Sequence, residues 1–441
     1  MHRRRLLAST AAAAAAVLAL SACAPSDDAP DPGADGGATS AAGSDECAEP
    51  VALDVWSWRT EDKDTYETIF DVFEEANPCI TVNFQAYKNT EYNQILQTGL
   101  TGSDGPDVAQ VRSYGLLQPL VEGGNLAPLD DVVPALADFD EAALDGARGK
   151  EDGGIYGVPF AAQTIQVFYN TAIFEEHGLE EPETWEDFIA ANDTLKEAGV
   201  TPLAVGAKDA WFVPTVHDAL TAAQYGGAEF QQKLRDGETD FNDPAYVKSI
   251  QSFADLEQYM PDDVVGVAYT DAQVLFTSGA AAMFAGGSYE LAFFQSTNPE
   301  LELGVFQVPP PEGSALDHPV SPGYADGNWG LSAASDNPEE AETLLNWLAS
   351  EEFGQMVAND LKQFSPVPGV TFDEPLMQEM WDLYQENPAP YLLLVDYRYG
   401  DPVGTDLMGE GGQQLFLGEL DAAGVASKIQ DGLSAWWTPG Q

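Results

Sequence analysis

The sequence is poor in basic residues. Its 441 residues include 17 Lys and Arg but 73 Asp and Glu, which gives a formal net charge of −56 at pH 7. A protein that binds nucleic acid needs basic patches to displace the counterions of the phosphate backbone, so nucleic acid is not expected as a partner. The same charge argues against docking to anionic lipid. We interpret the acidity as that of a well-solvated protein surface.

Cysteine and histidine are also scarce, with three and four residues. A structural zinc site needs four Cys or His ligands, and the scattered histidines do not offer such a set, so we expect neither a metal nor another cofactor. The sequence lacks a Gly-x-Ser-x-Gly elbow, a His-Glu-x-x-His motif and a P-loop. We therefore do not expect an enzyme, although so many acidic residues leave open a carboxylate pair of the kind that glycoside hydrolases use.

The N-terminal 22 residues have the pattern of a secretory signal. Three arginines precede an apolar run over residues 6–20, which is shorter than the roughly 20 residues of a membrane span. The run ends in Leu-Ser-Ala followed by Cys23, and these four residues resemble the bacterial lipobox, in which the peptide is cut before a cysteine that is then lipidated. We expect a mature chain held by acyl chains at Cys23 on the extracytoplasmic face of a bacterial membrane.

Residues 23–50 predict a flexible tether. From residue 24 to 49 the segment is rich in Asp, Pro, Gly, Ala, Ser and Thr and has no aromatic residue, so it cannot bury enough surface to offset its chain entropy. The two cysteines left after lipidation, Cys47 and Cys79, each come just before an expected strand. An exported protein permits a disulfide between them, which would attach the end of the tether to the first strand-helix unit.

Beyond residue 50 the sequence alternates between two periodicities. Residues 51–58, 80–87 and 106–112 have the composition and alternation of strands. Between them, residues 62–77 and 90–102 carry apolar side chains at helical spacing. This repeated order predicts an α/β protein with a largely parallel sheet.

The later segments continue the alternation. Helices are expected at residues 183–199, with Thr184 as N-cap and Gly199 as stop, and then at 213–225, 244–259, 338–360 and 407–437. Strand patterns cover residues 154–170, 201–207, 301–309 and 328–335, and residues 271–294 predict a helix, a strand and a second helix joined by turns.

Five stretches, taken together and in order, resemble the sugar-binding family of extracellular solute-binding proteins of ABC importers, which includes maltose-binding protein. They are VALDVWSWRTED, GLTGSDGPDVAQV, YGVPFAAQTIQVFYN, FTSGAAAMFAGGSYEL and GNWGLSAASDNPEEAETLLNWLAS. The resemblance covers nearly all of residues 51–437. It implies a two-lobed periplasmic-binding-protein fold of the α/β class, with a hinge of crossing strands and the ligand between the lobes.

The resemblance also implies boundaries and partners. The chain would cross between lobes near residues 159–163, 322–328 and 386–396. The N-lobe would comprise residues 51–160 and 328–388, and the C-lobe residues 161–322 and 395–441. Such a protein is a monomer that captures a mono- or oligosaccharide by hinge closure and delivers it to the permease subunits of an ABC importer.

A sugar presents hydroxyl groups around its edge and a C–H face, so its site needs planar polar side chains and aromatic rings. Candidates for this role fall at strand ends, in the hinge segments and at turns. They are Trp58, Arg59, Arg112, Gln163, Trp211, Gly287, Tyr289, Tyr324, Asp326 and Trp329. Tyr289 stands where the family's Gly-x-Trp turn has tryptophan, and Gly287 would let the backbone approach the ligand.

Each candidate also has a purely structural interpretation. Trp58 is equally compatible with the core, Trp211 with a surface loop, and Tyr289 with packing at a helix start. Arg59 and Arg112 stand out in a chain with so few basic residues, but each could form an ordinary salt bridge. The ligand itself stays open between a sugar and another solute such as a polyamine, an anion or a metal. A surface adhesion or sensor protein is a further alternative.

Overall fold

The computed structural model describes residues 47, 50–102 and 104–439. The expected signal over residues 1–22, the lipidated Cys23 and nearly all of the tether lie outside these residues. Residues 47–441 form one compact unit. Within the described part, no helix combines the length and apolarity needed to cross a bilayer.

One mixed sheet forms the centre of the fold. Its strands follow the order β2-β1-β3-β9-β5-β7-β6, with β4 and β10 added to β9 and β8 added to β5. The strands are β1 (Val51–Ser57), β2 (Ile80–Ala86), β3 (Val108–Arg112), β4 (Leu126–Ala127), β5 (Val158–Asn170), β6 (Thr201–Leu203), β7 (Ala281–Gly287), β8 (Leu303–Phe306), β9 (Ser321–Ser332) and β10 (Pro388–Pro390).

The expectation of a largely parallel sheet is correct for only some strand pairs, among them β10 with β9. β1 runs parallel to β2 and β3, and β6 runs parallel to β7. In the middle, β5 is antiparallel to β7, β8 and β9, and β9 is antiparallel to β3. The parallel pairs come from strand-helix-strand units, whereas β5 and β9 are long strands that run through the molecule in opposite directions.

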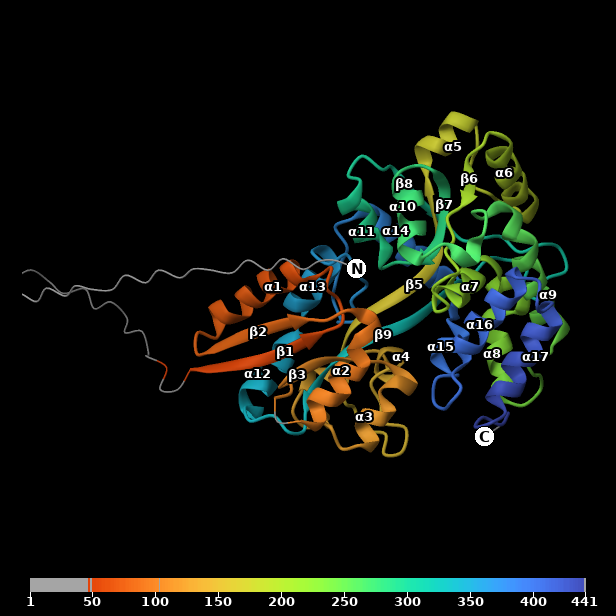
Figure 1. Ribbon diagram of the computed structural model, residues 1–441. Coiled ribbons are helices and arrows are strands. Elements are labelled where there is room, and N and C mark those ends of the chain that lie inside the picture. Colours follow the sequence, from red (N-terminus) through yellow and green to blue (C-terminus); the bar gives the residue numbers. More distant parts are fainter. Residues whose placement is uncertain (1–46, 48–49, 103, 440–441) are drawn as a thin grey trace, which may run out of the picture. The chain divides into compact units, whose positions relative to one another are not determined.

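Helices cover the sheet at both ends (Figure 1). Those packed around β1 to β3 are α1 (Lys63–Ala76), α2 (Asn89–Thr101), α3 (Gln118–Glu122), α4 (Glu141–Asp145), α12 (Pro338–Leu348) and α13 (Glu351–Asn359). The others are α5 (Thr171–His177), α6 (Trp185–Glu197), α7 (Phe212–Tyr225), α8 (Gly227–Arg235), α9 (Pro244–Asp255), α10 (Tyr269–Thr277), α11 (Glu290–Thr297), α14 (Pro375–Glu386), α15 (Leu392–Val395), α16 (Gly404–Phe416) and α17 (Ala422–Leu433). Short 3₁₀ helices include η2 (Pro134–Asp138).

The buried apolar side chains form two clusters. The first core takes its residues from 53–161 and 329–367, and the second core takes most of its residues from 165–320 and 376–433. The lobe boundaries expected from the sequence stay a proposal. Helix α14, which that proposal placed in the N-lobe, buries its apolar side chains in the second core.

Two helix expectations have different outcomes. Thr184 is confirmed as the N-cap of α6, because its hydroxyl accepts from the Asp187 amide at 3.1 Å and the Asp187 carboxylate accepts from the Thr184 amide at 3.1 Å. The single helix expected over residues 338–360 is wrong, since α12 ends at Leu348 and α13 begins at Glu351. The Ser350 hydroxyl caps the new start and acidic residues fill its first turn, so a second helix is stable there.

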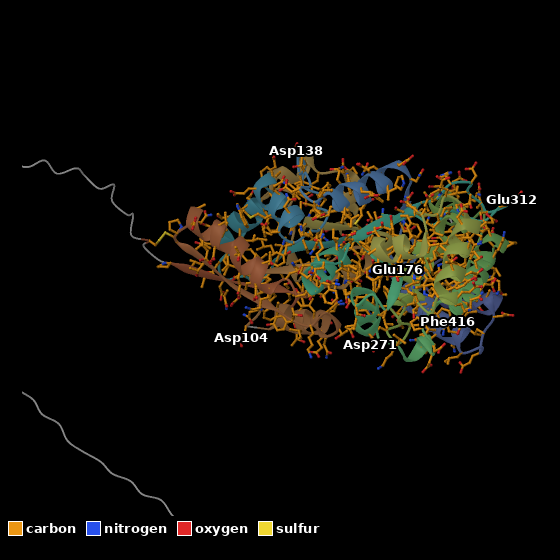
Figure 2. All side chains as sticks on the ribbon, turned by 90° about the horizontal axis from the view of Figure 1, so that it is seen from above. Asp104, Asp138, Glu176, Asp271, Glu312 and Phe416 are labelled. Atoms are coloured by element: carbon orange, nitrogen blue, oxygen red, sulfur yellow. A yellow bond between two sulfur atoms is a disulfide. The ribbon has the colours of Figure 1, made fainter. Side chains whose placement is uncertain are left out.

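The acidic side chains fit the interpretation of a solvated surface. The five acidic residues labelled in Figure 2 are all exposed. They are Asp104, Asp138, Glu176, Asp271 and Glu312. Water and salt screen the repulsion between such exposed charges, so the fold tolerates them.

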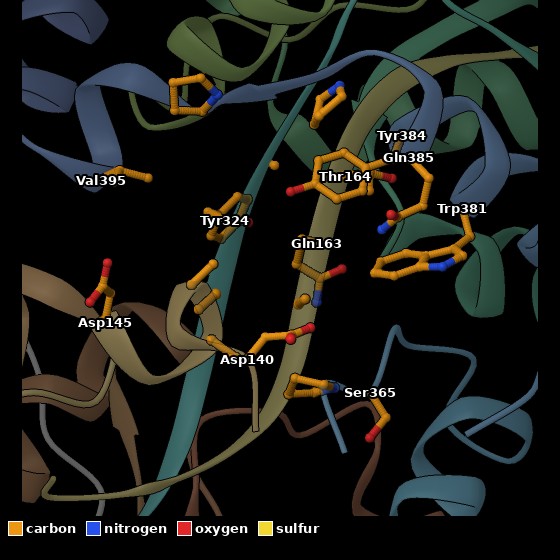
Figure 3. Close-up of a pocket in the computed structure, with 18 of the residues that line it drawn as sticks. Asp140, Asp145, Gln163, Thr164, Tyr324, Ser365, Trp381, Tyr384, Gln385 and Val395 are labelled. Carbon is orange, nitrogen blue, oxygen red and sulfur yellow. The ribbon is translucent and has the colours of Figure 1, made fainter. Parts of the chain in front are cut away.

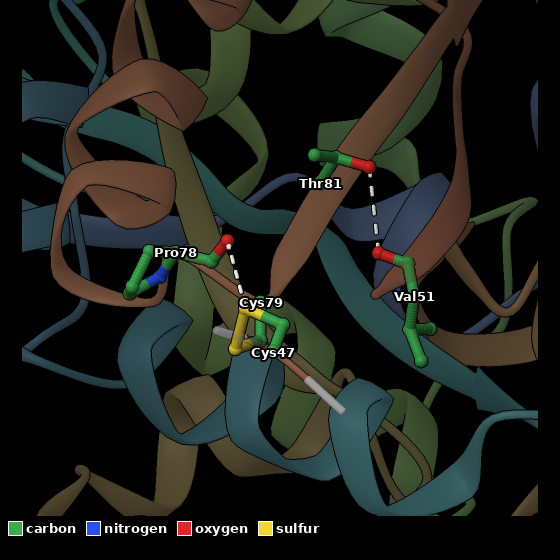
Figure 4. The surroundings of a disulfide bond; sticks show 5 residues. All are labelled: Cys47, Val51, Pro78, Cys79 and Thr81. Atoms are coloured by element: carbon green, nitrogen blue, oxygen red, sulfur yellow. Dashed lines mark hydrogen bonds between the residues drawn. A yellow bond between two sulfur atoms is a disulfide. The ribbon is translucent and has the colours of Figure 1, made fainter. Parts of the chain in front are cut away.

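A disulfide joins Cys47 to Cys79, with 5.4 Å between their Cα atoms (Figure 4). Cys79 immediately precedes β2, and its carbonyl accepts from the amide of Val51, the first residue of β1. The bridge therefore lies where both parallel strands begin, away from Trp58, which follows the end of β1. Cys47 Sγ also lies 3.6 Å from the Pro78 carbonyl oxygen, and this is a plain contact because a disulfide sulfur has no proton to donate.

Replacing both cysteines, Cys47→Ser with Cys79→Ser, should lower the free energy of unfolding by about 3–4 kcal/mol. The bridge closes a loop between residues 32 apart and so restricts the unfolded chain. Urea denaturation measures the change, with the wild type in reducing agent as the matched control. Equal urea midpoints for the oxidised wild type and the variant would contradict a stabilising role.

Candidate functional site

The residues that end β1 and β3 meet at one edge of the sheet, because these neighbouring strands are parallel. Trp58 follows β1 and Arg112 ends β3. The guanidinium carbon of Arg112 lies 3.9 Å from the centre of the Trp58 ring, a cation–π contact that fixes the plane of the charged group. Arg112 also donates to the Asn89 side chain at the start of α2, and its Nη1 atom lies 3.9 Å from Asp326 Oδ1. Arg112 is thus held in one orientation from three sides.

Two of the expected ligand platforms have no free ring face. Trp58 is 2% exposed, since Tyr92 and Phe160 pack beside it and Arg112 covers its face. It supports Arg112 and does not present an open ring. Trp329 is fully buried in the first core, so we withdraw the expectation that it contacts a ligand. Both corrections have the same cause, because the alternation of β1 and β9 turns these rings toward the core.

Strands β5 and β9 pair over residues 158–164 and 323–329, and we call this segment the crossing ribbon. The side chain of Gln163 on the ribbon is a hydrogen-bonding centre. Its Nε2 atom donates to Asp326 Oδ2 at 3.2 Å and to Gln363 Oε1 at 3.5 Å, and its Oε1 atom accepts from the Ser288 hydroxyl at 2.7 Å. Gln163 therefore links the ribbon to the loop after α13 and to the turn after β7.

The same network continues to Arg59. Gln363 Nε2 donates to Asp62 Oδ2 at 3.0 Å, and Asp62 in turn accepts from Arg59 Nε. Burial by itself lowers the pKa of Arg59, but the carboxylates of Asp62 and Glu61 outweigh it, so the pKa is raised and the side chain stays charged. Arg59 is the charged end of a chain of polar groups that reaches from β1 to the crossing ribbon.

Trp211 supplies an accessible aromatic ring on the side of the second core. It lies just before α7, is 38% exposed and packs edge-on against Tyr269 at 4.8 Å between ring centres. The Tyr269 hydroxyl donates to Glu290 Oε1 at 2.5 Å, and Gln273 Nε2 donates to Glu290 Oε2 at 2.7 Å. Burial raises the pKa of Glu290 to about 7, although these two hydrogen bonds oppose the shift. Glu290 thus holds in place the Tyr269 ring against which Trp211 packs.

The ring of Tyr289 packs directly against the backbone of Gly287. A Cβ atom on Gly287 would lie 2.1 Å from the Tyr289 ring, so glycine is needed to make room for that ring and not for a ligand. Burial raises the pKa of Tyr289 well above its usual value, with further contributions from Glu290 and Asp326 that Arg59 opposes. Tyr289, from the turn before α11, therefore lies within electrostatic range of residues on the ribbon and on β1.

Tyr324 and Asp326 belong to the same face of the ribbon as Gln163. Tyr324 stands opposite Gln163 in the strand register, and directly paired side chains point the same way. Its ring packs against Tyr391 at 5.5 Å between centres. Asp326 follows two residues later and bonds to Gln163. We call this side of the ribbon the polar face.

Sequence reasoning missed several residues of this region. Gln363 lies in a loop after α13 that carries no periodic pattern or motif, so nothing flagged it. Arg398 could have been flagged by the rarity of arginine, the argument that selected Arg59 and Arg112. The Arg398 Nε atom donates to the Thr405 hydroxyl at 3.3 Å, and its carbonyl oxygen lies where a Cβ atom on Gly115 would come within 1.9 Å. Arg398 therefore packs against the loop that directly follows Arg112.

A cavity of about 670 Å³ lies along the ribbon (Figure 3). The register pairs Ala162 with Ala325 and Thr164 with Gly323, so these four small residues form the face opposite to Gln163. All four line the cavity, and Tyr324 and Gln163 border it as well. Its other walls carry Trp381, Tyr384, prolines and the acidic residues of η2 and α4. The cavity does not include Arg59, Arg112, Trp211 or Tyr289, but it shares Gln163 and Tyr324 with the polar face, so the two candidate sites adjoin at these residues.

A serine, a histidine and an aspartate also lie together in the second core. His217 Nδ1 lies 3.0 Å from Asp218 Oδ1, and its Nε2 atom lies 3.2 Å from the Ser249 hydroxyl. All three are buried, and neither the cavity above nor a smaller one near Gly237 is lined by them. The Ser249 hydroxyl donates to the Tyr246 carbonyl, so this arrangement is an internal hydrogen-bonded group, in which Asp218 Oδ2 has no partner among the described residues.

Residues 56–355 match the family model for bacterial extracellular solute-binding proteins. The chain belongs to this family. Two relatives of this solute-binding protein are an uncharacterized ABC transporter extracellular-binding protein of Pyrococcus horikoshii and the multiple sugar-binding protein of Streptococcus mutans. The first is 24% identical over 324 residues and the match covers 71% of each chain; the second is 23% identical over 326 residues, covering 68% of this chain and 72% of the relative.

A solved chitin oligosaccharide binding protein has the same fold. It superposes with a TM-score of 0.74 at 22% identity, and the match covers 88% of this solute-binding protein and 98% of that chain. The two-lobed α/β architecture expected from the sequence is thereby confirmed. At this identity the likeness concerns the fold, and it leaves the ligand of this protein to be argued from its own residues.

Replacing Glu290 by glutamine should change how stability depends on pH. With a folded pKa of about 7 against an ordinary value of 4.5, the folded protein holds a proton between these pH values that the unfolded chain releases. This stabilisation is present at pH 5 and is lost as the pH rises through 7. From pH 5 to pH 8, the unfolding free energy of Glu290→Gln should therefore rise by about 2–3 kcal/mol relative to the wild type, as measured by urea denaturation. A difference that is the same at both pH values would show that Glu290 titrates normally.

Proposed function

We propose that this solute-binding protein captures a mono- or oligosaccharide on the polar face of the crossing ribbon and passes it to an ABC importer. One observation carries the proposal. Gln163 bonds to the Asp326 carboxylate on the ribbon, to the Gln363 amide from the loop after α13 and to the Ser288 hydroxyl, and Gln363 extends this network to Asp62 at the start of α1. Side chains that both donate and accept in fixed directions are what a ring of sugar hydroxyls requires.

The aromatic groups complete the site. Trp211 offers an exposed ring on the side of the second core, and Tyr289 lies beside Gly287 at the ribbon. The C–H face of a sugar packs well on such rings, whereas its hydroxyls would bond to Gln163, Asp326 and the arginines. A multiple sugar-binding protein and a chitin oligosaccharide binding protein are among the proteins similar to this chain, which supports a sugar as the ligand class.

The cavity on the opposite face of the ribbon is the weaker candidate. Most of its ribbon wall is alanine, glycine and threonine, which offer few hydrogen bonds to a hydroxyl-rich ligand, although Gln163 and Tyr324 also border it. Trp381 and Tyr384 could stack on a sugar there, so the cavity is the natural control site. Binding at the polar face would leave substitutions at these two residues without effect.

Hinge closure is the proposed mechanism. β5 and β9 each contribute to both cores, and β10 extends the pairing at the second core. Small changes in the backbone angles of these strands would open or close the space between the cores. A sugar that contacts both cores only in the closed form would shift the population toward that form. The permease would then recognise the closed form.

The proposed setting follows from the N-terminus. A lipid at Cys23 would hold the protein on the extracytoplasmic face of the cell membrane, where the tether lets the folded body reach the permease subunits. The protein would act as a monomer, without a cofactor and without catalysis. A non-sugar solute on the same fold is the main rival, and product analysis on the samples used for binding would reveal an enzyme.

Calorimetry with a panel of mono- and oligosaccharides tests the proposal. We expect at least one sugar to bind, and we expect Gln163→Ala to weaken its affinity at least tenfold, since a buried hydrogen-bonding group worth about 1–3 kcal/mol is lost. Trp381→Ala is the matched control on the opposite face and should bind as the wild type does. Circular dichroism of the free variants checks that both fold. Impaired binding by Trp381→Ala would move the site to the cavity whatever the effect of Gln163→Ala, because Gln163 borders both candidate sites.

A further inference from the structure

Arginine is rare in the described residues, and its five copies fall into two groups. Three arginines have a carboxylate in direct contact, namely Arg59 with Asp62, Arg148 with Glu141 and Arg235 with Asp396. Arg112 and Arg398 do not. The nearest carboxylate oxygen to Arg112 is that of Asp326 at 3.9 Å, which is beyond hydrogen-bonding distance, and no ion pair within 4.0 Å joins Arg398 to a described residue.

Arg112 and Arg398 belong to the same part of the polar face. The loop after Arg112 packs on the Arg398 backbone at Gly115. Arg112 is held by the Trp58 ring, by Asn89 and at longer range by Asp326, which leaves part of its five-donor fork unused. Arg398 uses one donor on the Thr405 hydroxyl. Two guanidinium groups thus share this region, and neither has a carboxylate within hydrogen-bonding distance among the described residues.

The electrostatics agree with this geometry. Burial, with a smaller contribution from the charge of Arg398, lowers the pKa of Arg112 to about 10, and Asp326 opposes this shift only in part. Asp406 interacts with Arg398 over a longer distance, and burial raises the pKa of its carboxyl group. A desolvated cation is costly without a close counter-ion. In a chain with 73 acidic residues, two arginines without a carboxylate in direct contact are unexpected for a structural region.

We propose that the saccharide captured on the polar face carries a carboxylate, as a uronic acid residue does, and that Arg112 and Arg398 bind this group. The planar fork of a guanidinium matches the two oxygens of a carboxylate, and both form short charge-assisted hydrogen bonds. Trp58 and Asn89 hold the Arg112 fork in place before the ligand arrives, so little side-chain entropy is lost on binding. This inference rests on the proposed function and narrows its ligand class.

Matched pairs of saccharides test the inference by calorimetry. Each pair consists of a uronic acid oligosaccharide and its carboxyl-reduced neutral counterpart, taken from the galacturonic, glucuronic and mannuronic acid series at one to four residues in length. For at least one pair we expect the acidic member to bind at least tenfold more tightly. Arg112→Gln and Arg398→Gln should each reduce this preference about tenfold, whereas Arg148→Gln, an arginine with its own carboxylate partner, should leave it unchanged.

The outcomes separate the two proposals. Neutral members that bind as tightly as their acidic counterparts would overturn the carboxylate inference and leave sugar capture standing. If neither member of any pair binds, and no sugar of the neutral panel binds, both the carboxylate inference and sugar capture are overturned. Because the comparison of paired ligands uses the wild-type protein, it stays decisive even if a variant does not fold. Arg112→Lys adds a further test, since it keeps the charge but loses the fork and should recover only part of the preference.

Discussion

The antiparallel pairing of β5 with β9 connects the two halves of this protein. Each strand is long enough to enter both cores, so their shared register decides which side chains meet where the cores adjoin. Gln163 stands opposite Tyr324, and Ala162 stands opposite Ala325. A slip of one residue would exchange the polar face for the small residues of the cavity face and remove the proposed site. The backbone hydrogen bonds between β5 and β9 also explain how two strands can hold the two cores in a defined orientation.

The polar face is costly to build, and its hydrogen bonds are nearly all within the protein. Gln163 is 1% exposed, yet both of its polar atoms have partners. Such a network is stable only when every member is satisfied, so its presence where two cores adjoin points to a selective advantage other than stability. Ligand recognition is the simplest one, because the same side chains can exchange protein partners for sugar hydroxyls during a hinge motion. The acidic exterior contributes little to this chemistry, since exposed charges are screened by salt.

Much of the fold was predictable from local pattern. The strand pattern of residues 154–170 predicted β5, and Thr184 as an N-cap predicted the start of α6. The break between α12 and α13 was missed because the apolar spacing continues through Ser350, and only the cap hydrogen bond ends the first helix. The family resemblance placed residues 328–388 in the N-lobe, and the burial of α14 in the second core is a tertiary relation that no local pattern shows.

The candidate site was predictable in part. Gln163 and Asp326 follow from their position in hinge segments, and the structure joins them by a hydrogen bond. Trp58 and Trp329 were misjudged because strand alternation cannot say which face is the core when both faces carry large side chains. Gln363 was not predictable, since it approaches the site through tertiary packing from a loop with no pattern of its own, whereas the rarity of arginine could have pointed to Arg398.

The central claim is that a ligand draws the two cores together across the polar face. Double electron–electron resonance between spin labels at Glu91→Cys and Val274→Cys measures this directly, because both positions are exposed, one on α2 beside Arg112 and the other on α10 beyond Tyr269. The account predicts that a saturating saccharide shortens the mean distance between the labels and narrows its distribution. A distance distribution that is the same with and without a bound saccharide would contradict it.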